Sequence, residues 1–134
     1  MKYLIDTNIC IYLLKKRDEV LRKKFNSFST EDFSVSVISV AELEFGISNS
    51  EQQESNRITI LKFLSQFTLL TFNEEDARAY GYILSKLRQA GTPIGEFDTL
   101  IAAQAINRNL ILLTNDNHFS RIPNVRIENW IKKK

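Results

Sequence analysis

The run LILLT at positions 110–114 has no polar residue before its last position. A strand with one face in water alternates apolar and polar side chains, whereas a strand covered on both faces does not. The run therefore predicts a buried strand of a parallel sheet with helices on both of its faces. Other short runs predict further strands: YLI at 3–5, FSVSVI at 33–38, FTLLTF at 67–72 and, as a candidate fifth strand, VRIENW at 125–130.

Helical patterns separate these runs. Apolar residues recur at helical spacing in 9–16, 18–28, 39–47, 56–66, 74–89 and 97–107. The second pattern has an expected apolar face of Val20, Leu21, Phe25 and Phe28, and the last, with LIAAQAI, predicts a helix buried on most sides. Strands that alternate with helices form βαβ units. We therefore expect an α/β protein with a mainly parallel central sheet.

The size and composition of the chain fit one folded unit. A chain of 134 residues can bury a core without a disulfide or a metal, and it shows no linker, repeat or low-complexity tract. We therefore expect a single domain spanning 1–134. Cys10 lies in an apolar run and is expected to be a small buried hydrophobe. No apolar stretch approaches the roughly 20 residues of a membrane span, and we expect a cytoplasmic protein with no membrane contact.

The charge of the chain is small but uneven. The net charge of +2 does not by itself indicate nucleic-acid binding. Basic residues gather in KKRDEVLRKK at 15–24 and in Lys132, Lys133 and Lys134 at the end. A solvated helix face and a frayed tail are the default interpretations, and contact with a phosphate backbone is the alternative.

Four acidic residues lie where the elements of a parallel sheet bring side chains to one edge. Asp6 directly follows YLI, Glu42 follows FSVSVI in what should be the first turn of the next helix, and Asp116 follows LILLT. Asp98 opens a helix after the turn-like GTPIG. Ligands of such sheets bind beyond the carboxyl ends of the strands. The four carboxylates are therefore expected to meet in one cleft.

Helix capping explains each acid taken singly. Asp6, Asp98 and Asp116 are good N-cap residues. Ser39 and Glu42 form a capping-box pattern, in which Ser39 caps the helix and Glu42 reaches back to the Ser39 amide. Capping does not explain why four such residues should converge on one cleft, and both interpretations stay open.

Carboxylates in one cleft indicate a bound cation. Like charges repel and their pKa values rise unless a cation lies among them. Oxygen ligands without a His or Cys cluster favour Mg²⁺, with Mn²⁺ as the alternative. Such an ion suits phosphodiester hydrolysis, because it activates a water and neutralises charge that grows on the phosphate. The only histidine, His118, is expected in a surface loop, and a role as general acid is the less favoured alternative.

Four segments resemble the PIN-domain ribonucleases and, more closely, the VapC toxins of bacterial toxin–antitoxin pairs. They occur in family order along nearly the whole chain: IDTNICIYLL, AELEFG, GTPIGEFDTLIAA and LILLTND. The ending RIPNVRIENW is similar to that of the enteric VapC branch, which cleaves initiator tRNA in the anticodon stem-loop. The resemblance implies a three-layer α/β/α sandwich and Mg²⁺- or Mn²⁺-dependent cleavage of RNA.

The resemblance also implies residue roles. Asp6, Glu42, Asp98 and Asp116 match the family's acidic quartet, which is catalytic and binds the metal, although many relatives have Asn where this chain has Asp116. Two further matches, expected to hold the carboxylates or a water in place, are Asn8 and Thr114.

The chain departs from the family pattern at one position near the quartet. Glu96 in GEFD stands where close relatives often have Pro, two residues before Asp98. We expect an exposed side chain without a role. An effect on metal affinity and a brake on the approach of RNA are the alternatives.

The partners are also implied by the resemblance. They are a tRNA substrate, a second copy of the chain in a homodimer and a VapB antitoxin encoded beside it, with operator DNA bound only through the antitoxin complex. The antitoxin of such pairs inserts a C-terminal segment along the cleft of the toxin. Candidate contacts, for which core packing is an equal alternative, are Ile9, Ile11, Tyr12 and Leu13.

Other function classes fit the residues less well. A phosphatase that forms an aspartyl-phosphate on Asp6 usually has a second acid two residues on, where this chain has Asn8. A phosphate-accepting receiver would need an acceptor Asp after the third strand, where FTLLTF runs into Asn73 and Glu74. A silent member that binds only its antitoxin and DNA is disfavoured by the intact quartet.

Overall fold

The computed structural model of the chain describes residues 1–131, so the basic residues Lys132, Lys133 and Lys134 lie outside the described part. Within it, five parallel strands form one sheet in the order β3-β2-β1-β4-β5. The strands are β1 (Tyr3–Ile5), β2 (Phe33–Ser36), β3 (Thr68–Leu70), β4 (Ile111–Leu113) and β5 (Ile127–Glu128). This confirms the parallel sheet and the fifth strand; β1 has the predicted bounds, and β2 to β5 are shorter than the runs that predicted them.

In residues 1–131, six α-helices and two short 3-10 helices connect and cover the strands. They are α1 (Thr7–Lys15), α2 (Glu19–Asn26), η1 (Thr30–Asp32), α3 (Val37–Ser48), α4 (Gln53–Leu64), α5 (Glu74–Gln89), α6 (Glu96–Asn107) and η2 (Asn117–Arg121). The predicted helix at 74–89 has the observed bounds, because Asn73 and Asp76 form a capping box at its start. Sequence patterns did not indicate η1 or η2.

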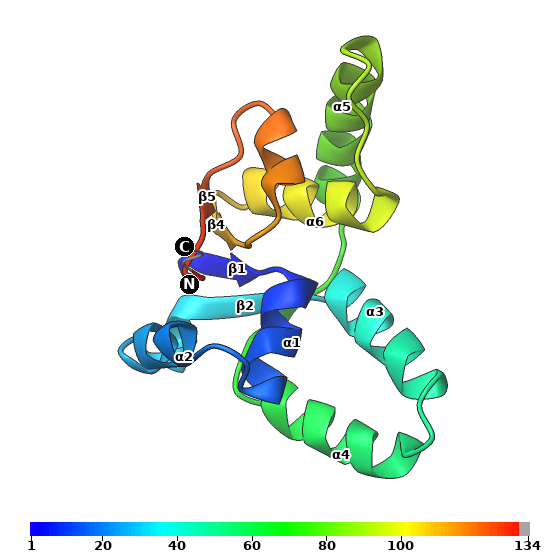
Figure 1. Cartoon of the computed structure of the whole chain (residues 1–134). Helices are drawn as coiled ribbons and strands as arrows, with labels where there is room; N and C mark the ends of the chain where they lie inside the picture. The colour runs from blue at the N-terminus through cyan, green and yellow to red at the C-terminus, as the bar shows by residue number, and fades with distance from the viewer. Residues whose placement is uncertain (132–134) are drawn as a thin grey trace.

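The helices form a layer on each face of the sheet, as Figure 1 shows, with α1 to α4 on one side and α5 and α6 on the other. Alternate residues of β1 point into two separate cores: Tyr3 and Ile5 pack with α1 and α2, and Leu4 packs with α5 and α6. The three-layer α/β/α sandwich is therefore confirmed. The prediction of a buried LIAAQAI helix is also confirmed, since most of α6 from Thr99 to Ala105 is buried.

The boundary between β2 and α3 differs from the prediction. β2 ends at Ser36, and the side chain of Ser36 accepts a hydrogen bond from the amide of Ile38 as the N-cap of α3. Ser39 is instead a buried residue inside the helix, and Glu42 is its sixth residue. The predicted capping box of Ser39 and Glu42 is therefore wrong. Val37 and Ile38 extended the apolar run past the end of the strand, and Ser36 supplied the stronger cap.

The structure corrects one prediction about an apolar face and settles part of another. On α2, Leu21 and Phe25 are buried as expected, but Val20 is exposed. On α1, Ile9 and Cys10 are fully buried in the core. Of the two interpretations of Ile9, contact with the antitoxin and core packing, the structure supports core packing. Ile11, Tyr12 and Leu13 are partly buried against the same core. No helix in residues 1–131 has both the length and the apolar character needed to cross a bilayer.

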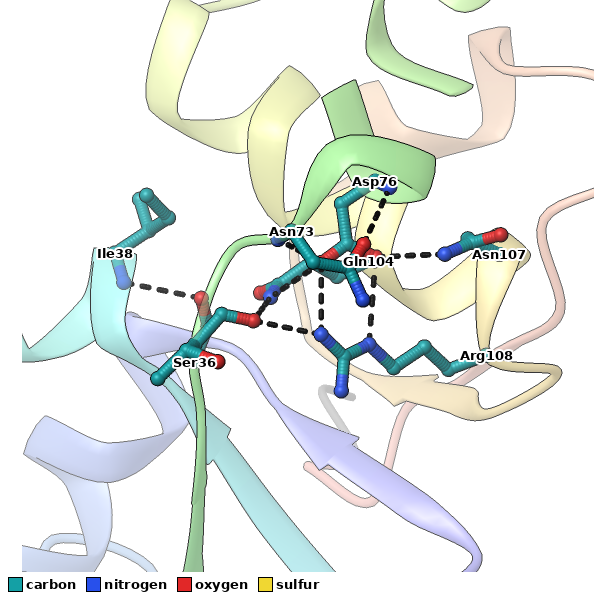
Figure 2. A network of polar contacts seen from close by, with 8 residues as sticks. Ser36, Ile38, Asn73, Asp76, Gln104, Asn107 and Arg108 are labelled. Carbon is teal, nitrogen blue, oxygen red and sulfur yellow. Dashed lines mark hydrogen bonds and ion pairs between the residues drawn. The ribbon is translucent and has the colours of Figure 1, made fainter. Parts of the chain in front are cut away.

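A buried polar network fixes α5 against α6. Figure 2 shows Asp76 of α5 surrounded by Asn73, Gln104, Asn107 and Arg108. Arg108 Nη2 lies 2.8 Å from Asp76 Oδ2 and also donates to the carbonyl of Thr71. Burial by itself raises the pKa of Asp76, but hydrogen bonds from Arg108, Asn73, Asn107 and Gln104 outweigh it and lower the pKa to about 2. These contacts hold α6, the helix that carries Asp98, against α5.

Candidate active site

A cavity opens at the carboxyl edge of the sheet, where β1 and β4 lie side by side. The chain runs from β1 through β2 to β3 in one direction and continues through β4 to β5 on the other side of β1. In open parallel sheets, ligands bind at this reversal of strand order. The cavity has a volume of about 540 Å³, and its lining residues are Asp6, Thr7, Asn8, Ile11, Glu42, Phe45, Phe97, Asp98 and Asp116.

Asp6 lies at the tip of β1 and is only 4% exposed. It occupies the N-cap position of α1, but its side chain caps no helix amide. Its Oδ2 instead accepts a 2.8 Å hydrogen bond from the hydroxyl of Thr114, which follows β4. Burial raises the pKa of Asp6 to about 7; the Thr114 and Thr7 hydrogen bonds oppose this shift, and the charges of Asp98 and Glu42 add to it. Capping does not explain Asp6.

Glu42 reaches the same cavity from the second turn of α3. The Thr7 hydroxyl donates a 2.5 Å hydrogen bond to Glu42 Oε1 and lies 2.7 Å from Oγ of the buried Ser39. Thr7 is the first residue of α1, so this contact joins the start of α1 to α3. It holds the Glu42 carboxylate in the wall of the cavity that Asp6 also lines.

Asp98 enters the cavity from the first turn of α6. The N-cap of α6 is Gly95, and no side chain caps this helix. Burial raises the pKa of Asp98, and the negative charges of Asp116 and Glu42 raise it further, while His118 opposes them. Because no side chain caps α6, the capping interpretation of Asp98 is wrong. The negative charges of Asp116 and Glu42 act on its carboxylate instead.

Asp116 is the one acid of the four for which capping is confirmed. Its Oδ1 accepts a hydrogen bond of 2.9 Å from the amide of His118 at the start of η2. Its own amide donates to the Thr114 hydroxyl oxygen at 3.0 Å, which ties it to the residue that contacts Asp6. His118 is exposed, as expected, and its Nδ1 lies 3.2 Å from Asp116 Oδ1. Asp116 both caps η2 and lines the cavity.

The donor set suits a hard divalent cation. The four carboxylates that line the cavity offer oxygen ligands alone, and burial together with repulsion from the other acids raises the pKa values of Asp6 and Asp98. Oxygen donors of this kind fit Mg²⁺ or Mn²⁺. Across residues 1–131, however, no three acidic, His or Cys side chains are already grouped as a metal cluster. The carboxylates surround the cavity and would have to draw closer around an ion.

A family model matches this chain. The model for the PIN domain matches residues 3–125.

The chain belongs to the PIN-domain family.

Full-length relatives of this PIN domain carry VapC names. This chain is 36% identical over 131 residues to the tRNA(fMet)-specific endonuclease VapC of Salmonella typhimurium, and the match covers 97% of this chain and 98% of the relative. It is 40% identical over 132 residues to ribonuclease VapC2 of Haemophilus influenzae, covering 98% and 99%. These relatives place the PIN domain in the VapC group.

Solved structures agree with the sequence relatives. The PIN domain superposes on a chain of DNA-bound VapBC from Salmonella typhimurium with a TM-score of 0.93 at 36% identity, covering 98% of this chain and 99% of that one. VapBC2 from Rickettsia felis, bound to a DNA fragment from its promoter, gives a TM-score of 0.91 at 36% identity, covering 98% and 100%.

The PIN domain brings together all four predicted acids and Asn8, which lines the cavity with an exposed side chain. Thr114 is buried behind Asp6. Glu96 is exposed, as expected, and lines an adjoining hollow of about 370 Å³ with Asp98 and Glu42.

Sequence reasoning missed other residues of the site. Ser39 was assigned to a cap, and Thr7, Phe45 and Phe97 were given no role. Thr7 stands between two predicted site residues in DTN, and Phe97 stands directly before Asp98. Their proximity in the sequence to predicted site residues was the signal that could have identified Thr7 and Phe97.

Proposed function

We propose that this chain is a metal-dependent endoribonuclease, the toxin of a toxin–antitoxin pair. The observation that carries the proposal is the convergence of four carboxylates, from the ends of β1 and β4 and from α3 and α6, on one cavity. Related proteins are named ribonucleases or tRNA(fMet)-specific endonucleases. We infer that the substrate is tRNA, with the anticodon stem-loop of initiator tRNA as the first choice. Its cleavage would stop translation.

The ion in this proposal is Mg²⁺, with Mn²⁺ as the alternative, held by Asp6 and Asp98 and completed by Glu42 and Asp116. When bound, it supplies a water activated for in-line attack and neutralises charge on the scissile phosphate. The chain's own residues hold the ligands in position: Thr114 orients Asp6, and Thr7 orients Glu42. Basic residues of 15–24 are proposed to attract the RNA backbone.

An apolar groove supports an antitoxin partner. It has a volume of about 430 Å³ between α1, α3 and α4, and its apolar lining includes Ile11, Leu14, Leu43, Ile47 and Ile60. It adjoins the active cavity, because Ile11 and Glu42 line both. Two related structures are VapBC complexes bound to DNA. We propose that a VapB segment occupies this groove, that the complex binds operator DNA and that the toxin is a homodimer.

The phosphoacceptor alternative is less well supported. Asp6 is buried and hydrogen-bonded to Thr114, which reduces its availability as a nucleophile. Incubation with acetyl phosphate followed by mass measurement tests this alternative. A stable added phosphate on Asp6 would favour it over the nuclease.

The experiment that tests the nuclease is sequencing of RNA ends after brief expression of the wild type and of Asp6→Ala. We expect new ends at one position in the anticodon loop region of one tRNA, present only with the wild type. Identical end profiles for the two proteins would contradict the proposal.

A further inference from the structure

Two phenylalanine rings stand exposed on the wall of the active cavity. Phe45 of α3 is 70% exposed and Phe97 of α6 is 50% exposed, yet both line the cavity that contains the four carboxylates. Phe45 lies three residues after Glu42 on one helix, and Phe97 directly precedes Asp98 on the other. Residues three apart on a helix share a face. Each ring is thus linked through the backbone to a carboxylate of the site.

Neither ring contributes to the two cores. Both are absent from the clusters of buried residues and from the side chains packed against them. Single exposed apolar residues are common on protein surfaces, and this chain exposes others, such as Ile58 and Tyr82. Phe45 and Phe97 differ from these because both line the cavity of the carboxylates, and this shared position points to a ligand of that cavity.

The chemistry of the cavity selects the kind of ligand. None of its lining residues, all within 1–131, is a lysine or an arginine, so in the proposed function the bound cation holds the phosphate and the bases need contacts of another kind. Proteins that bind single-stranded nucleic acid combine contacts to the backbone with aromatic rings on which bases stack. A nucleotide chain presents bases on both sides of each phosphate, and this cavity presents a ring on each of two helices that flank the carboxylates.

A polypeptide is a poorer match for these rings. The continuous apolar groove between α1, α3 and α4 lies beside the cavity and offers aliphatic side chains such as Leu14, Leu43 and Ile47. The two rings are instead set among carboxylates, with Glu96 and Asp98 next to Phe97 and Glu42 one turn from Phe45.

We propose that Phe45 and Phe97 are stacking platforms for the two nucleobases that flank the scissile phosphate. This inference rests on the ribonuclease function proposed above. Stacking reads no base identity, since every base has an aromatic face. The two rings therefore set affinity for unpaired loop nucleotides, whose bases can splay apart, and disfavour duplex RNA.

The test uses a single-stranded RNA of roughly 10 nucleotides, within the usual site size, that contains the anticodon-loop sequence of initiator tRNA. One version carries 2-aminopurine on the 5′ side of the cleaved phosphate and the other carries it on the 3′ side. Binding is measured by fluorescence with Ca²⁺ in place of Mg²⁺ to prevent cleavage. The wild type should quench both probes, because stacking on a ring quenches 2-aminopurine.

The variants assign each ring to a base. Phe45→Ala should relieve quenching on one side of the phosphate and Phe97→Ala on the other, and each should weaken affinity about tenfold. Phe→Trp at either position should keep the quenching, whereas Phe→Leu should not, because leucine stays apolar but has no aromatic ring on which a base can stack. Tyr82→Ala is the matched control: Tyr82 is an aromatic residue 63% exposed on α5, outside the cavity.

The outcomes separate this inference from the function on which it rests. In Mg²⁺ or Mn²⁺, wild-type protein that cuts no RNA overturns both. A wild type that cuts RNA, with both alanine variants binding and quenching as it does, overturns the stacking inference alone. If the variants lose affinity for the antitoxin but keep wild-type RNA binding, the rings are a protein contact and the inference is wrong.

Discussion

The hydroxyl of Thr114 donates a 2.8 Å hydrogen bond to Oδ2 of Asp6, a residue 108 positions away in sequence. β1 and β4 are adjacent and parallel, with Ile5 paired to Leu113, so the residues that follow the two strands meet at the sheet edge. The same Thr114 oxygen accepts from the amide of Asp116. One buried hydroxyl thus fixes the positions of two of the four carboxylates.

Thr114→Val should keep the fold and impair catalysis. Valine has a similar shape, but it cannot donate to Asp6 or accept from Asp116. Loss of a residue that orients metal ligands typically costs 10- to 100-fold in metal affinity or activity, and we expect a loss of that order in the rate of tRNA cleavage and in Mn²⁺ affinity by calorimetry. Thr114→Ser retains the hydroxyl and is the control. Wild-type Mn²⁺ affinity and cleavage in the valine variant would show that this hydrogen bond is dispensable.

The stability of the metal-free protein should fall as the pH rises from about 4 to about 7. The folded pKa of Asp6 is about 7, above its ordinary 3.8, so in this window the folded state keeps a proton that the unfolded state has released. Asp6→Asn removes this penalty, which is as much as about 4 kcal/mol for a shift of this size. Urea unfolding in EDTA should therefore show an advantage of the variant over wild type that is small at pH 5 and largest at pH 8.

Two controls accompany this measurement. Glu51→Gln changes an exposed acid outside the site and should leave the pH profile unchanged. Addition of Mg²⁺ at pH 8 should stabilise the wild type and not Asp6→Asn. A wild-type stability that stays flat or rises between pH 5 and pH 8 relative to Asp6→Asn would show that the Asp6 charge is compensated without a metal.

Asp76 should make the opposite contribution to stability. Its folded pKa is about 2, below the ordinary 3.8, so its stabilisation is present above pH 4 and is lost as the pH falls toward 2. Arg108→Met leaves the buried carboxylate without its partner and should destabilise the protein by about 3–5 kcal/mol. Arg57→Met breaks the half-exposed pair with Glu44 and should cost about 1 kcal/mol or less. Equal unfolding free energies for the two variants at pH 7 would contradict this ranking.

Gly46→Leu should separate antitoxin binding from catalysis. Gly46 lines the apolar groove, and a Cβ placed on it meets no atom within 4 Å, so a side chain can begin there without a clash and adds bulk to the groove. We expect normal tRNA cleavage and a large loss of affinity for the antitoxin encoded beside this chain, measured by calorimetry. Gly81→Leu, on α5 and equally unobstructed, is the control. Unchanged affinity in Gly46→Leu would place the antitoxin elsewhere.

The sequence predicted the fold well where one signal dominated. LILLT and YLI became neighbouring strands, because unalternated apolar runs fit only a sheet covered on both faces. The bounds of α5 followed from a capping box that tertiary contacts did not override. At the end of β2, two caps competed three residues apart, and the choice of Ser36 over Ser39 depended on where β2 stopped pairing with β3. A single sequence does not encode that point locally.

The sequence predicted which acidic residues form the site, but it did not predict the hydrogen bonds that hold them. The four acids were found because strand ends share an edge in a parallel sheet, and all four line one cavity. Which acids also cap a helix depended on local geometry: Asp116 does, and Asp6 and Asp98 do not. The hydrogen bond from Thr7 to Glu42 joins α1 to α3 and depends on how these helices pack, so spacing in the sequence could not reveal it.

The most direct test is the rate at which purified protein cleaves initiator tRNA in Mg²⁺, compared between the wild type and Asp98→Asn. The variant keeps the shape of the side chain and removes the charge that the carboxylate gives to an ion. We expect its rate to fall by orders of magnitude while its melting temperature does not fall below the wild-type value. Full activity of Asp98→Asn, or of the wild type in excess EDTA, would contradict the account.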